Sequence, residues 1–183
     1  DKEFIQSYPS KSIPELIAKL PGIKIKDLRG GGLGASQSID IRGFGDTASS
    51  NSLILLNGQR LTNIDLSLVD FTTIPRDSID RIEVIMGNST VLFGNNATAG
   101  SINIITNQSI EKGDQLNASF LTGSLGKYAS YLSAVKTKDN FSVKGNHNTI
   151  FADGYRRNSA LYQNNGSIEL SYDNEYYDFY LNL

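Results

Sequence analysis

The stretch STVLFGNNATAGSINIIT, residues 89–106, decides the fold of the first part of this chain. Its last six residues alternate, with Ile102 and Ile104 on one face, which is the period of a half-buried strand. Small residues fill Gly94–Gly100 before that strand, and their glycines permit backbone conformations that tight loops need. The stretch therefore predicts a strand that is entered from a glycine-rich loop.

A helix is predicted near the N-terminal end of the chain. Ser12 and Glu15 have the spacing of a capping box, in which each side chain bonds the other residue's backbone N–H. The apolar face of this helix consists of Leu16, Ile17 and Leu20. Pro21-Gly22 then predicts its end.

Short strands are predicted between this helix and residue 89. Their apolar residues alternate or run continuously over residues 23–26, 38–41, 53–56 and 82–85. Asn57-Gly58 predicts a hairpin turn after the third of these strands, with a return strand near Gln59. One clear helix, short strands and long glycine-rich loops indicate an α+β fold with a small mixed sheet.

Two glycine-rich stretches fit the pattern of a dinucleotide-binding loop, GGGLGA (30–35) and GFGDTA (43–48). Such a loop needs a helix directly after it, because the helix N-terminus binds the phosphates. A strand is predicted after each stretch instead, and no helix is expected to open at either. We therefore interpret both stretches as turns and loops, not as nucleotide sites.

The composition excludes several classes of function. The chain has 183 residues and a net charge of −2, so no strong basic field favours nucleic acid as a partner. It contains no cysteine, which excludes disulfides and thiol chemistry. Its one histidine, His147, has no nearby motif of a catalytic triad, and the spacing of Asp65 and Asp70 is too weak a signal for a calcium site. We expect no enzyme activity, no cofactor and no metal.

The character of the sequence changes near residue 107. All four prolines lie before it, whereas the remainder is rich in Tyr, Asn and Ser and alternates. We expect domains over residues 1–107 and 114–183, with a polar linker over 108–113. The second domain is predicted to be a meander of about five antiparallel strands, with a short turn at 138–140 and a long polar loop at 152–165.

Five stretches in the first domain resemble the plug domain of the TonB-dependent outer-membrane receptors, in the order and spacing of that family. They are LPGIKI (20–25), SIDIRGFG (38–45), SLILLNGQRL (52–61), IPRDSIDRIEVIMG (74–87) and the opening stretch, 89–106. The resemblance implies that the alternating second half is the start of a 22-strand transmembrane barrel, incomplete at five strands. Open sheet edges would let this fragment self-associate.

The resemblance also implies a function. A receptor of this family lies in the bacterial outer membrane and takes up a scarce nutrient complex, most often a ferric siderophore. The plug closes the barrel, and the TonB protein supplies energy by pulling on the segment before the plug, which we do not find in Asp1–Tyr8. The alternative, drawn from the alternation alone, is a soluble β-rich ligand-binding or adhesion module.

By position in the family, three loops are expected to face outward and bind the ligand, namely Arg29–Gln37, Asp46–Asn51 and Thr62–Asp70. Their polar candidates are Arg29, Gln37, Asp46, Asn51, Asn63 and Asp65. Arg42, Arg81 and Glu83 are expected to contact the barrel, with Arg42 and Glu83 in strands. The family usually has an arginine where this chain has Met86, so one charged contact between plug and barrel is expected to be missing.

Overall fold

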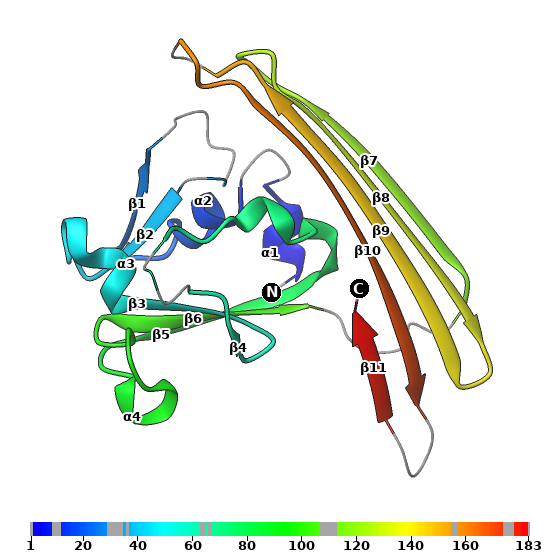
Figure 1. Ribbon diagram of the computed structural model, residues 1–183, viewed down its shortest axis with the longest axis horizontal. Coiled ribbons are helices and arrows are strands. Elements are labelled where there is room, and N and C mark those ends of the chain that lie inside the picture. The colour runs from blue at the N-terminus through cyan, green and yellow to red at the C-terminus, as the bar shows by residue number, and fades with distance from the viewer. Residues whose placement is uncertain are drawn as a thin grey trace. The chain divides into compact units, whose positions relative to one another are not determined.

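The computed structural model describes residues 2–8, 12–28, 35, 37–62, 65, 67–106, 113–154, 157–173 and 178–182 (Figure 1). The chain divides into two compact units, residues 1–107 and 108–183, and each unit is described by itself. No helix in the described ranges is long and apolar enough to cross a membrane.

Two sheets form the framework of the first unit. The smaller sheet pairs β1 (Ile23–Asp27) with β2 (Gln37–Ile41) in antiparallel register. The larger sheet has the order β4-β3-β6-β5 and consists of β3 (Ser52–Leu56), β4 (Gln59–Arg60), β5 (Ile79–Met86) and β6 (Gly100–Thr106). Because β3 and β6 are parallel while the other neighbours are antiparallel, the expected mixed sheet is confirmed.

Short helices precede the first strand or lie between later strands. They are α1 (Lys2–Gln6), α2 (Ile13–Ile17), α3 (Ala48–Asn51) and α4 (Thr90–Phe93). The predicted capping box of α2 is confirmed, because the Ser12 hydroxyl accepts from the Glu15 amide and a Glu15 carboxylate oxygen accepts from the Ser12 amide, 3.0 Å away. The helix ends earlier than predicted, since Ala18 already caps it.

The stretch after GFGDTA corrects one prediction. We expected no helix there, but a 3₁₀ turn over Gly45–Thr47 continues into the single turn of α3 before β3 begins. Alanine, serine and asparagine carry no apolar period, so the sequence pattern gives no sign of this turn. Hydrogen bonds from the Ser50 and Asn51 side chains to the Thr47 carbonyl support it.

The hydrophobic core of the first unit lies mainly on one face of the larger sheet. Ile54, Ile102 and Ile104 face the core, and none is more than 5% exposed. The other buried members come from the helices, β1, β2, the segment before β5, the start of β5 and the residue before β6: Ile5, Ile13, Leu16, Ile17, Ile23, Ile39, Ile41, Phe71, Ile74, Ile79 and Ala99. Full burial of such a side chain stabilises the fold by roughly 1.5–3 kcal/mol. A smaller cluster lies on the opposite face, where Phe93 packs against Leu53, Leu55 and Ala97.

The second unit is a meander of five antiparallel strands in sequence order (Figure 1). Its strands are β7 (Gln115–Thr122), β8 (Tyr128–Lys138), β9 (Phe141–Ala152), β10 (Leu161–Asp173) and β11 (Asp178–Asn182). The predicted number of strands and the tight turn between β8 and β9 are confirmed. β7 and β11 are the edges of this sheet, and association through them stays a prediction.

The predicted long loop at 152–165 is shorter than expected. β10 already begins at Leu161, which pairs with Ala152, and the ladder continues through Gln163, Asn164 and Asn165. The first residues of β10 are mostly polar, so apolar alternation does not predict a strand there. The hydrogen bonds between the strands need only an extended backbone, which polar residues also adopt.

Candidate functional site

The candidate site of the first unit lies where β3 and β6 begin. Parallel pairing puts Ser52 opposite Gly100, so α3, which precedes β3, and α4, which precedes β6, lie at the same edge of the sheet (Figure 1). The Ala99 amide donates to the Asn51 carbonyl at 2.9 Å and joins the two connections. We call this the α3–α4 edge.

A loop before α3 carries an exposed aromatic residue and an exposed cation. Arg42, Gly43 and Gly45 all have positive φ, and the Asp40 carboxylate accepts hydrogen bonds from the amides of Phe44 and Gly45 at 2.7 and 2.8 Å. These bonds fix the loop, because converging N–H groups bind an anion. The Phe44 ring is left 39% exposed.

Arg42 lies one residue beyond the end of β2, so the expectation that it sits in a strand is wrong. Its side chain is exposed and makes no ion pair with any described residue. A guanidinium nitrogen of Arg42 passes 3.9 Å from the position that a Cβ would take at Gly87. The side chain of Met86, just before that glycine, is 45% exposed.

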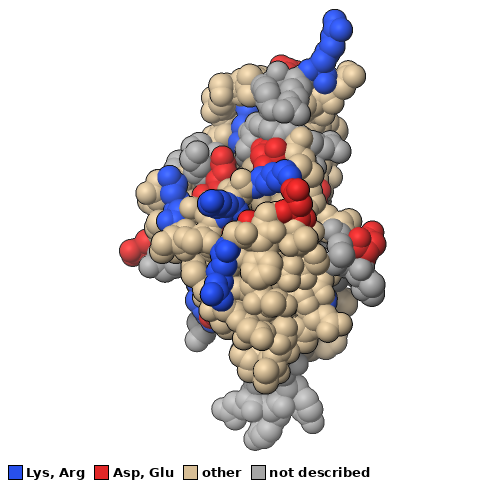
Figure 2. Space-filling view, turned by 90° about the vertical axis from the view of Figure 1, so that its left-hand side faces the viewer, with Lys and Arg blue, Asp and Glu red and all other residues tan. Residues whose placement is uncertain are grey.

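The α4 tip, Val91 and Leu92, is the most exposed apolar feature of the edge, with 94% and 71% of these residues accessible. Sequence reasoning missed it, because no helix or strand is predicted over Thr90–Phe93. The available signal is an apolar triplet, Val91 to Phe93, that lies outside every alternating segment. Figure 2 shows that charged side chains of both signs gather beside a broad uncharged area on this side of the molecule.

A small cavity connects two of the loops that were predicted to face outward. Its volume is about 20 Å³, enough for one water molecule. Ser49 and Ser52 line it from α3 and β3, and Ser67 and Val69 line it from the segment after β4. The structure therefore brings the second and third predicted loops together at the α3–α4 edge.

Two of the predicted ligand-binding residues are engaged within the first unit. Gln37 is only 3% exposed; its amide oxygen accepts from the Ser12 hydroxyl at 3.0 Å, and its nitrogen donates to Asp27 at 3.2 Å. Asp46 is exposed and lies 2.5 Å from the Lys26 ammonium, whose hydrogen bond and charge lower the pKa of this carboxyl. Gln37 therefore joins α2 to the small sheet, whereas Asp46 remains accessible.

The other predicted ligand-binding residues divide into two groups. Asn51 donates to the Thr47 carbonyl at 2.8 Å, and Asp65 accepts from the Ser67 amide at 3.0 Å, a bond that lowers the pKa of the Asp65 carboxyl. Both thus shape their own loops. Arg29 and Asn63 lie outside the described residues. Ligand contact stays a prediction for all six.

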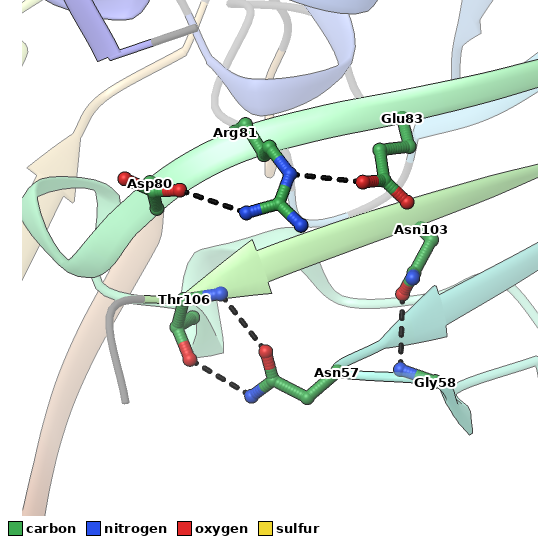
Figure 3. A network of polar contacts seen from close by, with 7 residues as sticks. All are labelled: Asn57, Gly58, Asp80, Arg81, Glu83, Asn103 and Thr106. Atoms are coloured by element: carbon green, nitrogen blue, oxygen red, sulfur yellow. Dashed lines mark hydrogen bonds and ion pairs between the residues drawn. The ribbon is translucent and has the colours of Figure 1, made fainter. Parts of the chain in front are cut away.

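Arg81 and Glu83 lie on β5 as expected, and they pair with each other (Figure 3). Arg81 donates to Glu83 at 2.9 Å and to Asp80 at 3.0 Å, and these hydrogen bonds raise the pKa of the arginine. All three side chains are about half exposed. Contact of this triplet with a barrel stays a prediction.

The opposite end of the larger sheet is closed by a polar network (Figure 3). Asn57 adopts positive φ in the predicted Asn-Gly turn, and its amide bonds both the backbone N–H and the hydroxyl of Thr106, at 2.9 and 2.8 Å. The Gly58 amide donates to Asn103 at 3.0 Å. Thr106, the last residue of β6, is thereby fixed to the turn between β3 and β4.

The second unit separates two kinds of side chain between its faces. One face of the sheet carries mainly polar residues, among them Ser133, Asn146, Asn148, Ser167 and Glu169. The other face carries two rows of aromatic residues in direct register, Tyr128–Phe151–Tyr162 and Phe141–Tyr172–Phe179. Tyr128 and Phe151 stack with ring centroids 5.1 Å apart.

The distance between the two aromatic rows is close to the height of the apolar band of an outer-membrane barrel. Ten residues separate Phe141 from Phe151 along β9, which is about 34 Å of strand. A tilt of about 45° reduces this to roughly 24 Å along the membrane normal, close to the apolar band of about 25 Å between the aromatic girdles of outer-membrane barrels. Leu132, Ala134 and Ile168 lie between the rows.

The described residues show neither a carboxylate bonded to the histidine nor a cluster of potential metal ligands. His147 lies on the aromatic face, 3.5 Å from the Thr149 hydroxyl, and no described carboxylate bonds its ring. No group of three or more potential metal ligands occurs in the described ranges.

Comparison with known proteins identifies the family. Residues 1–101, more than half of the chain, match the model of the TonB-dependent receptor plug domain. The chain belongs to this family. Relatives of the plug family that match this chain are named as transporters and receptors, not as enzymes, and lie in the outer membrane.

Several relatives in sequence are vitamin B12 transporters. BtuB of Photobacterium profundum is 38% identical over 105 residues, which are 57% of this chain and 16% of the relative. BtuB of Vibrio vulnificus is 38% identical over 59% of this chain and 17% of the relative. The chain thus spans about a sixth of the length of the curated relatives it matches.

The match to solved structures covers both units of the chain, whereas the family model covers residues 1–101. The ferric-catecholate import receptor Fiu of E. coli K12 matches with a TM-score of 0.73 and 20% identity, over 97% of this chain and 24% of Fiu. At this identity the match shows the fold, namely a plug followed by barrel strands that do not close within this chain.

Proposed function

We propose that this chain is the plug and the first barrel strands of a receptor that takes up a scarce nutrient complex across the bacterial outer membrane, with energy from TonB. The family match of residues 1–101 carries the proposal. The aromatic rows of the second unit support it, because they give one face the surface that lipid covers in an outer-membrane barrel. The alternative of a soluble module would leave these rows in water.

The α3–α4 edge is the part of the plug proposed to meet the ligand. Short turns of bacterial barrels lie at the periplasmic side, and the turn between β8 and β9 is of this kind. β7 begins at that same end of the meander, which is therefore proposed to face the periplasm. The α3–α4 edge contains α3, which lies in one of the three loops that the family resemblance directs outward, and the edge is proposed to face outward with that loop.

Two ligand classes are proposed for this edge. A ferric siderophore is the first, and similarity in fold to siderophore receptors supports it. A cobalamin is the second, because a vitamin B12 transporter is 38% identical to this chain over 105 residues. Exposed Phe44, Val91 and Leu92 supply apolar contacts that suit either class of large ligand.

The test is a binding measurement on the full-length receptor in detergent, with cyanocobalamin and ferric enterobactin as probes. We expect one probe to bind, and we expect Leu92→Asp to weaken it at least tenfold, because a desolvated carboxylate would then face the ligand. Gln59→Asp, exposed on β4 at the other end of the sheet, serves as the matched control and should leave affinity unchanged. Binding that is equally insensitive to both substitutions would contradict the assignment of this edge.

A further inference from the structure

Arg60 joins two parts of the first unit that are far apart in the sequence. One guanidinium nitrogen of Arg60, on β4, donates to the Phe93 carbonyl at 3.3 Å and to the Asn95 carbonyl at 2.8 Å. Phe93 is the last residue of α4, and Gly94 then turns the chain with positive φ. Carbonyls at a helix C-terminus lack partners within the helix, and a cation bound there also complements the helix dipole.

A second contact fixes the same end of α4. The Phe93 ring packs against Leu53, Leu55 and Ala97 on the face of the sheet opposite the main core. The base of α4 is therefore held by one polar and one apolar contact. Val91 and Leu92, which precede Phe93, make neither kind of contact, and their side chains project into solvent.

We propose that Arg60 is a positioning residue for the α4 tip. By binding the carbonyls after the tip, it sets the direction in which Val91 and Leu92 project and reduces the number of conformations that a ligand would have to order. The inference rests on the proposed function only in assuming that the α4 tip contacts the nutrient complex. The positioning itself depends on contacts within the first unit.

The first readout requires no ligand. In the full-length receptor, Arg60→Met keeps much of the aliphatic stem but removes both hydrogen bonds. We expect amides of residues 90–97 to exchange with deuterium about tenfold faster, since a hydrogen bond from a charged group contributes of the order of a tenfold change in a local equilibrium. Gln59→Met, at the neighbouring exposed position on β4, should leave these amides unchanged. Unchanged exchange over β5 and β6 verifies that the first unit of the variant is folded.

The second readout is affinity for cyanocobalamin or ferric enterobactin, whichever the unmodified receptor binds. Arg60→Met should weaken it about three- to tenfold, and Arg60→Lys, which keeps the charge and a donor, should lie in between. Faster exchange together with weaker binding supports the inference. Unchanged exchange overturns it, and so does faster exchange with unaltered affinity.

The two hypotheses fail separately. If the receptor binds neither probe, the proposed ligand classes fail, and exchange alone decides whether Arg60 positions the tip. If Leu92→Asp abolishes binding while Arg60→Met changes neither readout, the α3–α4 edge stands and the role of Arg60 is rejected.

Discussion

The two units of this chain place their large apolar side chains in opposite ways. In the first unit Leu16, Ile41, Leu53 and Ile102 are at most 1% exposed. In the second unit the largest apolar side chains, such as Phe120 and Tyr162, are 70% and 64% exposed, while the opposite face of the sheet is polar. All members of the described hydrophobic clusters belong to the first unit.

Under the proposed function, the strands of the two units face different solvents. A domain in water gains free energy by burying apolar surface within itself. A barrel strand in a membrane presents apolar surface to lipid and keeps its polar groups on the inside. The same substitution should therefore have different consequences in the two units.

The largest effect is expected from Ile102→Ala. Ile102 is completely buried, and truncation should lower the free energy of unfolding of the first unit by about 2–5 kcal/mol through lost burial and a cavity. Ile168→Ala, on the exposed face of β10, is the matched change in the second unit and should cost much less. Native-state hydrogen exchange of β6 and β10 amides in the full-length receptor measures both. Equal losses would remove the contrast.

A charge tests the second unit more directly. Leu132→Lys would put an ammonium between the aromatic rows and should destabilise the membrane-inserted receptor by about 2–4 kcal/mol. Ser133→Lys, the next residue, faces the other way and should cost less. Urea titration of the receptor in lipid vesicles compares them. If the two variants behave alike, the aromatic face does not contact lipid.

These predictions also show what the sequence could reveal. Alternation at Ile102 and Ile104, the Ser12–Glu15 capping box and the Asn57-Gly58 turn each predicted the local structure that is observed. Such features depend on residues close together in the chain. The α3–α4 edge could not be predicted in this way, because it results from parallel pairing between β3 and β6.

The sites differ in the same respect. Gln37 is polar and precedes a strand, so the sequence suggests an exposed loop residue, yet its partners Ser12 and Asp27 come from other elements and bury it. Arg60 and its acceptors are likewise separated along the chain. A single sequence does not specify which of its distant polar groups meet.

The hydrogen bonds between Asn57 and Thr106 allow the two units to be compared near the end of the first unit. Asn57→Gly keeps the left-handed turn but removes the two side-chain bonds to Thr106, each worth about 0.5–1.5 kcal/mol. We expect the Thr106 amide to exchange faster while amides of the second unit do not change. Asn57→Asp, which retains an acceptor for that amide, should be milder; a larger effect from Asp than from Gly would contradict this account.

The smallest effect is expected at the exposed pair of Lys26 and Asp46. The hydrogen bond and charge of Lys26 hold the pKa of Asp46 below its ordinary value of 3.8. The contribution of the pair is therefore complete at neutral pH and is lost as the pH falls through that lowered pKa. Lys26→Met should return the pKa toward 3.8, as NMR titration of the carboxyl carbon would show, with little change in stability because both groups are exposed.

The parallel pair of β3 and β6 has a consequence for how the protein reaches its folded state. Ser52 can pair with Gly100 only after the segments between them have been synthesised and the chain has closed a long loop. Pairings between distant residues form slowly, whereas each strand of the second unit needs only its immediate neighbour in the sequence. A nascent chain that stops before β6 exposes Leu53 and Ile54 on a strand with an unpaired edge, so β3 needs protection from aggregation until β6 has been made and pairs with it.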